Sequence, residues 1–326
     1  MEWIDAALAD LERAGRLRTP RALTPLDAVR ALHGTREVTV FCSNDYLGLR
    51  EHPSLAAAVR DALAAYGTGV GASRLISGHT HLHEQAEQSL ADLVGLPAAL
   101  LASSGYALNV GALAALMGPD DLVFSDALNH ASLIDGIRLS RARTVIVPHN
   151  DLAALETLLR DAPPARRRWM VTESLFSMDG DLPDLVALRE VTARYGVALY
   201  VDEAHAVGVI GDGGGLCRHL GVVPECLVGT LGKALGASGA FIAGSPSLKS
   251  FLWNRCRAFV FSTGLAPPPS PLSNSRRARS VKTRKLSPPS APTSPASAPG
   301  SASAPSPTAG ATSRPSSRSA STTTVA

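Results

Sequence analysis

The chain has 326 residues, which is enough for one large or two ordinary domains with a buried core. Its formal net charge of +3 is unevenly distributed. Residues 267–326 hold eight of the 31 Lys and Arg residues and no Asp or Glu. Residues 1–266 carry 23 basic and 28 acidic side chains, which gives a net charge of −5. The mildly acidic main part gives no reason to expect nucleic acid as a partner.

The first 37 residues predict a helix followed by a basic connector around Arg18. The opening helix contains acidic residues and therefore does not resemble a signal peptide. No apolar run approaches the roughly 20 residues that span a bilayer. We expect a soluble, cytoplasmic protein that does not bind membranes.

From residue 38 to residue 266, short apolar runs alternate with segments of helical spacing. The expected strands are Val38–Cys42, Ala98–Ala102, Leu122–Ser125, Thr144–Pro148, Trp169–Thr172, Ala198–Asp202, Cys226–Gly229 and Ala240–Ala243. The expected helices include Leu55–Tyr66, His83–Val94, Leu152–Arg160 and Leu185–Tyr195. This alternation predicts an α/β fold, in which helices cover both faces of a mostly parallel sheet and ligands bind beyond the carboxyl ends of the strands.

Residues 267–326 have a different composition, with 12 of the 23 prolines among Ser, Ala and Thr. Such a segment buries too little apolar area to offset its chain entropy, so we expect it to be disordered. Its basic side chains could bind phosphate groups, and a shifted reading frame in GC-rich coding sequence would also produce this composition.

Two patterns could suggest metal sites, and both have simpler explanations. The four cysteines are scattered without a C-x-x-C pair, which fits a reducing compartment. His79, His81 and His83 alternate, but a helical pattern follows Thr80 and no fourth ligand has a suitable spacing. We therefore expect no metal.

The strongest chemical signal is Lys233, which lies in the glycine-rich segment Thr230–Gly236 directly after an apolar run. Upstream, the strand-like Val197–Val201 leads into Asp202 and His205. A partly unprotonated lysine forms Schiff bases, and a carboxylate can hold a pyridine nitrogen protonated so that the ring accepts electrons. A surface lysine and a capping aspartate would explain either motif alone. Together, in this order, they predict a site for pyridoxal 5′-phosphate (PLP).

Three further segments fit such a site. Ser104-Gly105-Tyr106 follows an apolar strand and opens a helix, whose free amides suit a phosphate. His130 lies in a loop, where it could be structural or could stack on the pyridine ring. Ser177 could donate a hydrogen bond to the phenolic oxygen of the cofactor or to substrate. The acids of Glu173–Asp181 could also suggest an acid/base pair, but Asp179-Gly180 is a plain turn signal.

These motifs together resemble the α-oxoamine synthases, PLP enzymes of the aspartate aminotransferase fold. The likeness runs from the first helix to Ala266, about four fifths of the chain. The segments that carry it are Ser43–Leu49, Gly71–Leu75, Ser104–Tyr106, His130–Gly136, Phe176–Gly180, Val201–His205 and Thr230–Lys233.

The resemblance implies a role for each residue of the PLP site. Lys233 would carry PLP as a Schiff base, and Asp202 would pair with the pyridinium nitrogen. His205 would contact the ring oxygen, with Ser177 nearby, and His130 would stack on the ring. Three residues would lie at the phosphate end: Gly105, Tyr106 and Thr230.

The resemblance also implies substrate contacts. Arg18, or its neighbours Arg16 and Arg21, would contact the acyl substrate. Asn44 and His130 would be further substrate contacts. Thr263 would belong to a stretch that reaches the partner's cofactor in a homodimer.

The implied reaction is a decarboxylative condensation of L-alanine with a pimeloyl thioester, carried by a carrier protein or coenzyme A, in biotin biosynthesis. The freed Lys233 amine would remove the Cα proton. Glycine-using members of the family, such as 2-amino-3-ketobutyrate ligase or 5-aminolevulinate synthase, also fit His205–Gly208. A non-catalytic protein with a basic binding tail is a third interpretation.

The likeness ends where family members continue for roughly a hundred residues into a small α/β domain. Residues 267–326 stand in its place. We therefore expect part of the substrate contacts and of the dimer surface to be missing, and turnover to be weak or absent.

Overall fold

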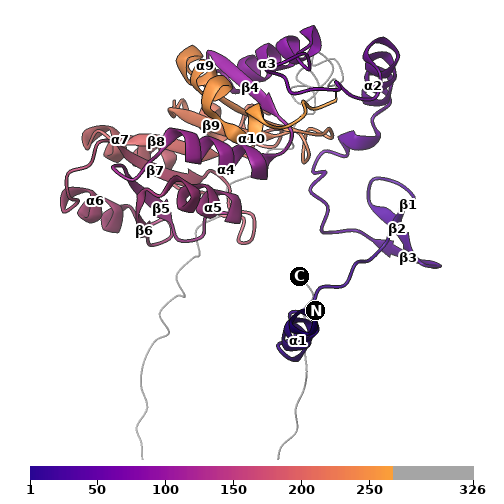
Figure 1. The fold of residues 1–326 in the computed structure, drawn as a ribbon, viewed down its shortest axis with the longest axis horizontal. Coiled ribbons are helices and arrows are strands. Elements are labelled where there is room, and N and C mark those ends of the chain that lie inside the picture. Colours follow the sequence, from indigo (N-terminus) through magenta and orange to yellow (C-terminus); the bar gives the residue numbers. More distant parts are fainter. Residues whose placement is uncertain (267–326) are drawn as a thin grey trace, which may run out of the picture. The chain divides into compact units, whose positions relative to one another are not determined.

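The computed structural model describes residues 1–266 (Figure 1). The expected disordered tail and missing small domain lie outside the described residues. The helices are α1 (Glu2–Arg13), α2 (Pro53–Tyr66), α3 (His81–Val94), α4 (Gly105–Leu116), α5 (Ala131–Ser140), α6 (Leu152–Arg160), α7 (Leu185–Arg194), α8 (Leu216–Leu220), α9 (Pro246–Arg255), α10 (Arg257–Val260) and the short 3-10 helix η1 (Leu49–Glu51). The strands are β1 (Thr24–Pro25), β2 (Arg30–His33), β3 (Arg36–Thr39), β4 (Ala98–Ala102), β5 (Leu122–Asp126), β6 (Arg143–Val147), β7 (Arg168–Glu173), β8 (Ala198–Asp202), β9 (Cys226–Thr230) and β10 (Ala240–Gly244).

Seven of these strands form the central sheet, in the order β4-β10-β9-β8-β7-β5-β6. All pairs from β9 to β6 are parallel, whereas β10 pairs antiparallel with both β9 and β4. Every strand except β10 therefore runs in the same direction, and their carboxyl ends meet at one edge. The expectation of a mostly parallel sheet is confirmed.

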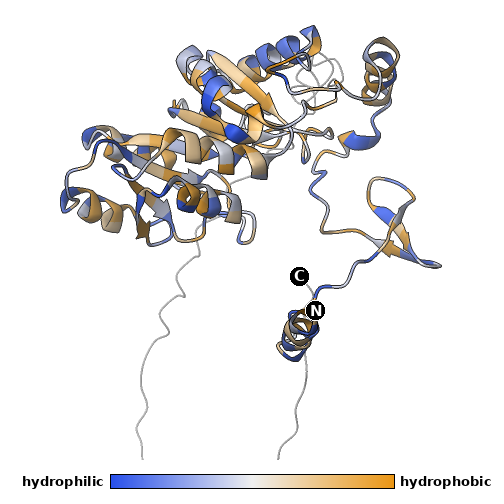
Figure 2. Ribbon diagram, viewed as in Figure 1, coloured by the Kyte–Doolittle hydropathy of each residue, from blue (hydrophilic) through white to orange (hydrophobic). Residues whose placement is uncertain are grey.

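Helices cover both faces of this sheet, as expected. Side chains alternate along each strand, so that on β8 Leu199 and Val201 enter one hydrophobic core and Tyr200 enters the other. Buried residues of α3, α6, α7 and α8 complete the first core, and those of α4, α5, α9 and α10 complete the second. The apolar strands between helices that carry polar residues are visible when the ribbon is coloured by hydropathy (Figure 2).

Side-chain caps explain where several helices begin. Ser104 accepts a hydrogen bond from the Ala107 amide at the start of α4. Asp151 and Asp184 cap α6 and α7 in the same way. Each such cap typically contributes about 1 kcal/mol, so these polar residues fix the helix starts beyond the strand ends.

The expected strand Val38–Cys42 is not part of the central sheet. Its residues overlap β3, which pairs antiparallel with β2, and β2 pairs with β1 in a separate three-stranded sheet. His33 pairs with Arg36, which leaves a two-residue turn whose first residue, Gly34, has a φ of 64°. A glycine at this place favours a tight hairpin, and a hairpin joins antiparallel neighbours.

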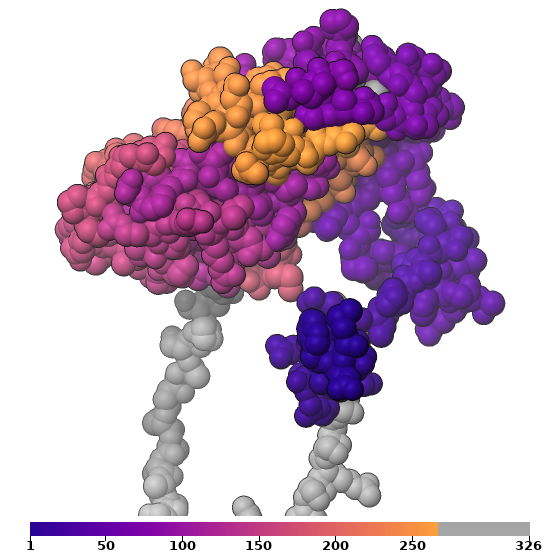
Figure 3. Space-filling model, in the orientation of Figure 1, coloured from indigo at the N-terminus to yellow at the C-terminus, as the bar shows by residue number. Residues whose placement is uncertain are grey.

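The last described residues contact α3 and the segment that precedes it. Ser73 and Thr263 form an isolated antiparallel bridge, and His83 Nε2 lies 3.1 Å from the Leu265 carbonyl oxygen. In the space-filling view the surface of α9 and α10, in orange, borders that of α3 and α4, in purple (Figure 3). No helix within residues 1–266 is long and apolar enough to cross a membrane.

Candidate active site

The candidate site is a cavity of about 180 Å³ at the carboxyl edge of the sheet. Glu173, Asp202 and Thr230, which are the last residues of β7, β8 and β9, form part of its wall. The complete lining is Gly105, Tyr106, Asn109, His130, Ser132, Glu173, Asp202, Ala204, His205, Val228, Gly229, Thr230 and Lys233. Parallel strands thus bring residues together that lie far apart in the sequence.

Lys233 contacts His205 directly within this cavity. The Lys233 Nζ lies 2.6 Å from His205 Nε2, and the opposite ring nitrogen of His205, Nδ1, lies 2.7 Å from the Tyr46 hydroxyl. The Tyr46 hydroxyl lies 3.1 Å from Asn44 Oδ1. A chain of polar contacts therefore runs from the lysine amine to the segment between β3 and α2.

The electrostatic setting favours the neutral forms of both groups. Burial lowers the pKa of Lys233, although Asp202 and Glu173 oppose this. Burial, together with the charges of Lys233 and His130, lowers the pKa of His205 to about 4. His205 is therefore neutral near pH 7, and an unusually large fraction of Lys233 carries a free amine.

The turn that carries Lys233 packs against the chain near α2. Gly236 has a φ of 64°, and a Cβ at this position would lie 2.6 Å from the Arg50 amide nitrogen and 2.7 Å from the Leu49 carbonyl carbon. Glycine is therefore required here both by conformation and by the close approach of the two backbones.

Asp202 is held in place by hydrogen bonds from two elements. Its side chain is 6% exposed and accepts hydrogen bonds from Asn109 Nδ2 at 2.7 Å and from the Ala204 amide at 2.8 Å. The Tyr200 hydroxyl donates to Asn109 Oδ1, and Asn109 Nδ2 also donates to Ser132 Oγ. This buried network fixes the carboxylate at the cavity wall.

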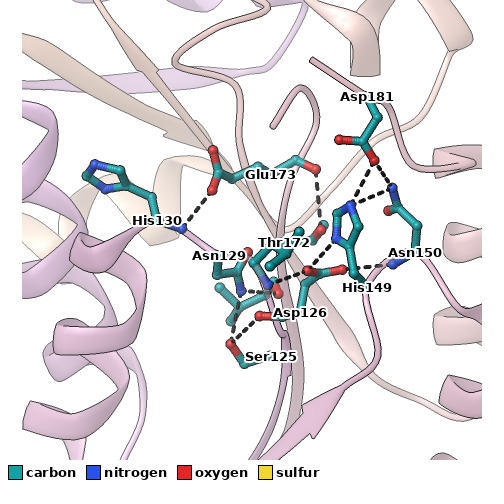
Figure 4. A network of polar contacts seen from close by, with 11 residues as sticks. Ser125, Asp126, Asn129, His130, His149, Asn150, Thr172, Glu173 and Asp181 are labelled. Atoms are coloured by element: carbon teal, nitrogen blue, oxygen red, sulfur yellow. Dashed lines mark hydrogen bonds and ion pairs between the residues drawn. The ribbon is translucent and has the colours of Figure 1, made fainter. Parts of the chain in front are cut away.

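His130 lines the same cavity and caps α5, and its backbone nitrogen faces Glu173 (Figure 4). Its Nδ1 lies 2.8 Å from Ser132 Oγ, and its backbone amide donates to Glu173 Oε1 at 2.7 Å. Glu173 pairs with Asp202 in the register of β7 and β8. Burial, together with the charge of Asp202, raises the pKa of Glu173 to about 7. The Glu173 carboxyl group therefore stays protonated over much of the acidic range.

The start of α4 and Thr230 form another side of the cavity. An added Cβ at Gly105 would meet nothing within 4 Å, so the first turn of α4 is open to a bound group. Thr230 Oγ1 accepts a hydrogen bond from the Gly232 amide, which fixes the start of the lysine turn. The amides at the start of a helix attract anions.

A second, larger cavity of about 790 Å³ shares Lys233 with the first. Asn44 and Arg50 lie on its wall, and Leu55, Ala56 and Val59 of α2 provide apolar surface. The lysine thus lies between the two cavities.

A second polar network joins Asp126, His149 and Asp181, to the right of His130 in Figure 4. His149 Nδ1 and Nε2 each lie 2.8 Å from a carboxylate oxygen, of Asp126 and Asp181 respectively. Burial alone would lower the pKa of His149, but these two hydrogen bonds outweigh it and raise the pKa. The network ties the loop after β7 to the ends of β5 and β6.

Most of the predicted site residues lie in the first cavity. These are Lys233, Asp202, His205, His130, Gly105, Tyr106 and Thr230. Asn44 lies on the second cavity. Ser177 is exposed in the loop after β7, and Arg18 is exposed in the connector after α1. Neither lines a cavity at Lys233, and their roles stay predictions.

The sequence reading missed three residues that shape the site. Tyr46 falls within the segment Ser43–Leu49 and Asn109 lies three residues after Tyr106, but the partners of Asn109 and Tyr46 are 93 and 159 residues away. The turn signal Asp179-Gly180 after Glu173 favours a structural role for this segment. The position of Glu173 as the residue just beyond a predicted apolar strand, like Asp202, was the available signal. Among residues 1–266, no cluster of His, Cys, Asp and Glu could hold a metal ion.

Comparison with known proteins identifies the family. Residues 36–277 match the family described as aminotransferase class I and II. The 8-amino-7-oxononanoate synthase of Geobacter sulfurreducens is 48% identical over 278 residues, which is 84% of this chain and 71% of that protein. Eight such curated relatives are 44–52% identical, and the chain spans 61–71% of their length.

Solved structures agree with this result. A variant of the serine palmitoyltransferase from S. paucimobilis with a bound PLP–myriocin aldimine has a TM-score of 0.77 and 28% identity, over 85% of this chain and 71% of that one. The 8-amino-7-oxononanoate synthase from Francisella tularensis has a TM-score of 0.64 and 28% identity, over 74% of this chain and 69% of that one. This chain therefore belongs to the aminotransferase class I and II family and, within it, to the PLP-dependent 8-amino-7-oxononanoate synthases.

Proposed function

We propose that this chain condenses L-alanine with a pimeloyl thioester, on a carrier protein or coenzyme A, to give 8-amino-7-oxononanoate, CO2 and the free carrier. The shared name of the relatives supports a role in biotin biosynthesis. The observation that carries the proposal is the convergence of Lys233, Asp202, His205 and His130 on one cavity at the carboxyl edge of the sheet.

The residues of this cavity fit PLP. Lys233 offers an amine with a lowered pKa, and Asp202 is a buried carboxylate held by Asn109. The open start of α4 at Gly105 suits the phosphate. Lys233, Asp202, His205, His130, Gly105, Tyr106 and Thr230 would hold the cofactor. When bound, PLP would supply an aldehyde that condenses with amines and a pyridine ring that withdraws electrons from the amino-acid Cα.

Lys233 has two tasks in this proposal. It provides the amine that holds the cofactor, and it then takes a proton at Nζ from the Cα of the amino acid. Burial favours the neutral amine that both tasks require. His205 helps because its neutral ring accepts a hydrogen bond from Nζ without competing for the proton.

Asp202 and His130 keep the reacting groups in place. Asp202 would keep the pyridine nitrogen of bound PLP protonated, and the hydrogen bond from Asn109 fixes the orientation of the carboxylate. His130 is fixed by Ser132 and by its own backbone bond to Glu173, so its ring can lie flat against a planar group and exclude water. Asn44 on the second cavity is assigned to substrate, and Arg18 and Ser177 keep the roles that the resemblance implies.

The proposal includes a homodimer, with Thr263 close to the partner's cofactor. Large apolar side chains at Phe41, Ile76 and Phe261 are exposed in the single chain. Their exposure supports the proposal that a second copy of the chain covers them. Light scattering of the purified protein tests the assembly, and a monomer at all concentrations would contradict it.

The function is tested with the purified full chain, PLP, L-alanine and either pimeloyl-coenzyme A or the pimeloyl carrier protein. Mass spectrometry should detect 8-amino-7-oxononanoate and release of one CO2 per product. Lys233→Arg is the control, because it keeps the positive charge but not the nucleophilic amine. Equal product from Lys233→Arg, or product with glycine but not with alanine, would overturn the assignment.

A further inference from the structure

The contact between Tyr46 and His205 joins two segments that the proposed mechanism treats separately. Tyr46 lies between β3 and α2, and His205 follows β8. Their polar atoms are 2.7 Å apart, and their rings are tilted by 46° with centroids 6.1 Å apart. His205 thus has Lys233 on one ring nitrogen and Tyr46 on the other.

The protons in the hydrogen bonds from Lys233 through His205 and Tyr46 to Asn44 can be arranged in two ways. His205 is neutral near pH 7, because burial and the charges of Lys233 and His130 disfavour its cation, so the ring carries one proton. A charged Lys233 can only donate, which makes Nε2 the acceptor and puts the proton on Nδ1. Nδ1 then donates to the Tyr46 oxygen, and the Tyr46 hydroxyl donates to Asn44 Oδ1.

The second solution applies when Lys233 is neutral. Its nitrogen then has a lone pair and can accept from a proton on Nε2. Nδ1 becomes an acceptor, and the Tyr46 hydroxyl turns to donate to it. The Tyr46 hydroxyl can both donate and accept, so the ring can stay in place in both states.

We propose that Tyr46 is a positioning residue that lets His205 exchange its proton between its two ring nitrogens as the group in front of Nε2 changes from donor to acceptor. The part of this inference that concerns the reaction rests on the proposed function. The hydrogen bonds themselves do not depend on it. Tyr46 acts only through His205 and does not line the first cavity.

Asn44 gives this arrangement a second consequence. The Tyr46 hydroxyl has one proton, so it donates either to His205 or to Asn44. When it donates to His205, Asn44 Oδ1 is free to accept from an N–H or O–H group of a molecule in the second cavity. The protonation state of Lys233 thereby determines whether Asn44 Oδ1 is free to accept a hydrogen bond in the second cavity.

The test is Tyr46→Phe, with Tyr66→Phe as the matched control. Tyr66 ends α2, is also exposed, and lines neither cavity. The ring nitrogens of His205 are followed by ¹⁵N NMR in the cofactor-free protein as the pH is raised. In the wild type and in Tyr66→Phe, the protonated nitrogen should change from Nδ1 to Nε2 as Lys233 loses its proton.

In Tyr46→Phe, His205 Nδ1 loses its hydroxyl partner. The charged Lys233 should still favour the Nδ1-protonated form, but the change to the Nε2-protonated form should be incomplete after Lys233 loses its proton, because no hydroxyl donates to Nδ1. The dissociation constant of this variant for PLP should rise by roughly three- to tenfold, as expected for the loss of one hydrogen bond. Unchanged ring-nitrogen shifts in Tyr46→Phe, or the same change in Tyr66→Phe, would overturn the proposal.

Asn44→Ala provides a second variant that keeps the tyrosine. With Asn44 removed, the Tyr46 proton has His205 as its remaining acceptor in this chain of contacts. The share of the Nε2-protonated form should therefore rise at a given pH. A fall in that share would contradict the proposal. These NMR results do not depend on product formation, so a failure of the proposed reaction would be recognised separately.

Discussion

Buried carboxyl groups at the two ends of the parallel strands have pKa values that are shifted in opposite directions. At the amino end, Asp121 precedes β5 and accepts hydrogen bonds from Arg166 and Arg167, which precede β7. Burial alone would raise the pKa of Asp121, but these arginines outweigh it and lower the pKa to about 2. At the carboxyl end, Glu173 and Asp202 lie side by side, and the pKa of Glu173 rises to about 7.

The difference separates a group that stabilises the fold from groups that are available for chemistry. The charge of Asp121 is neutralised by fixed partners, so its ionisation favours the folded state. The carboxyl groups at the opposite edge are held by neutral donors, namely the His130 amide, Asn109 and the Ala204 amide. The charge of Lys233 attracts Glu173 but does not offset its burial and the charge of Asp202. Ionisable groups with perturbed pKa values in a cavity are typical of active sites.

The largest effect is expected when a charge is removed from the carboxyl edge. Asp202→Asn should lower product formation by about 10³-fold, within the range of a lost acid–base group. Its free energy of unfolding should stay within about 1 kcal/mol of the wild type, because the amide can keep the contact to Asn109. Steady-state kinetics with saturating PLP and urea unfolding test the two parts. If Asp202→Asn lost stability but kept full activity, Asp202 would stabilise the fold rather than take part in the reaction.

A pH-dependent effect on stability is expected for Glu173→Gln. The folded pKa of about 7 lies above the ordinary value of 4.5, so the wild type loses stability as the pH rises from 4.5 through 7. A shift of this size corresponds to at most about 3 kcal/mol. Gln keeps an acceptor for the His130 amide and does not ionise, so the variant should be more stable than the wild type at pH 8 and similar at pH 4.5. Urea unfolding at both pH values measures this, and equal stabilities at pH 8 would show that Glu173 is compensated like Asp121.

A smaller loss is expected for Asp121→Asn at the opposite end. The folded pKa of about 2 lies below the ordinary value of 3.8, so the stabilisation is present above pH 4 and is lost as the pH falls towards 2. Both arginines are about half exposed, which reduces the expected cost to about 1–2 kcal/mol at pH 7. Unfolding experiments from pH 7 to pH 2 should show the variant and the wild type converge. A selective loss of activity at unchanged stability would remove the contrast between the ends.

The smallest effect is expected for Ser177→Ala. The side chain is exposed and lines neither cavity at Lys233, so stability should change by no more than about 0.5 kcal/mol and the rate by less than about threefold. The same kinetic and unfolding assays apply. A much larger loss of rate would support the position of Ser177 near the ring oxygen of the cofactor, which the resemblance implies.

The sequence allowed the layered fold to be predicted because strand and helix patterns are local. The expected strand Ala98–Ala102 coincides with β4, and the expected helix Leu152–Arg160 coincides with α6. The N-terminal hairpin was missed because β2 and β3 have four residues each and include charged ones. An apolar run beginning at Val38 therefore resembled a strand of the main sheet.

The site was predicted where the residue type itself indicates the chemistry. Lys233 and Asp202 could be proposed from the sequence because Schiff-base formation and pyridine protonation would require those groups. Asn109, Tyr46 and Glu173 could not be assigned, because their importance depends on which residue lies next to them. Strand register and distances between remote segments determine those neighbours, and neither follows from local patterns.

The tight contact of Gly236 with Leu49 and Arg50 also bears on how the protein is made. These residues are about 190 positions apart, so the contact cannot form until almost all of the described chain has left the ribosome. Closing so long a loop is costly and slow. The segment that carries Asn44 and Tyr46 therefore cannot pack against the lysine turn until residue 236 has been synthesised.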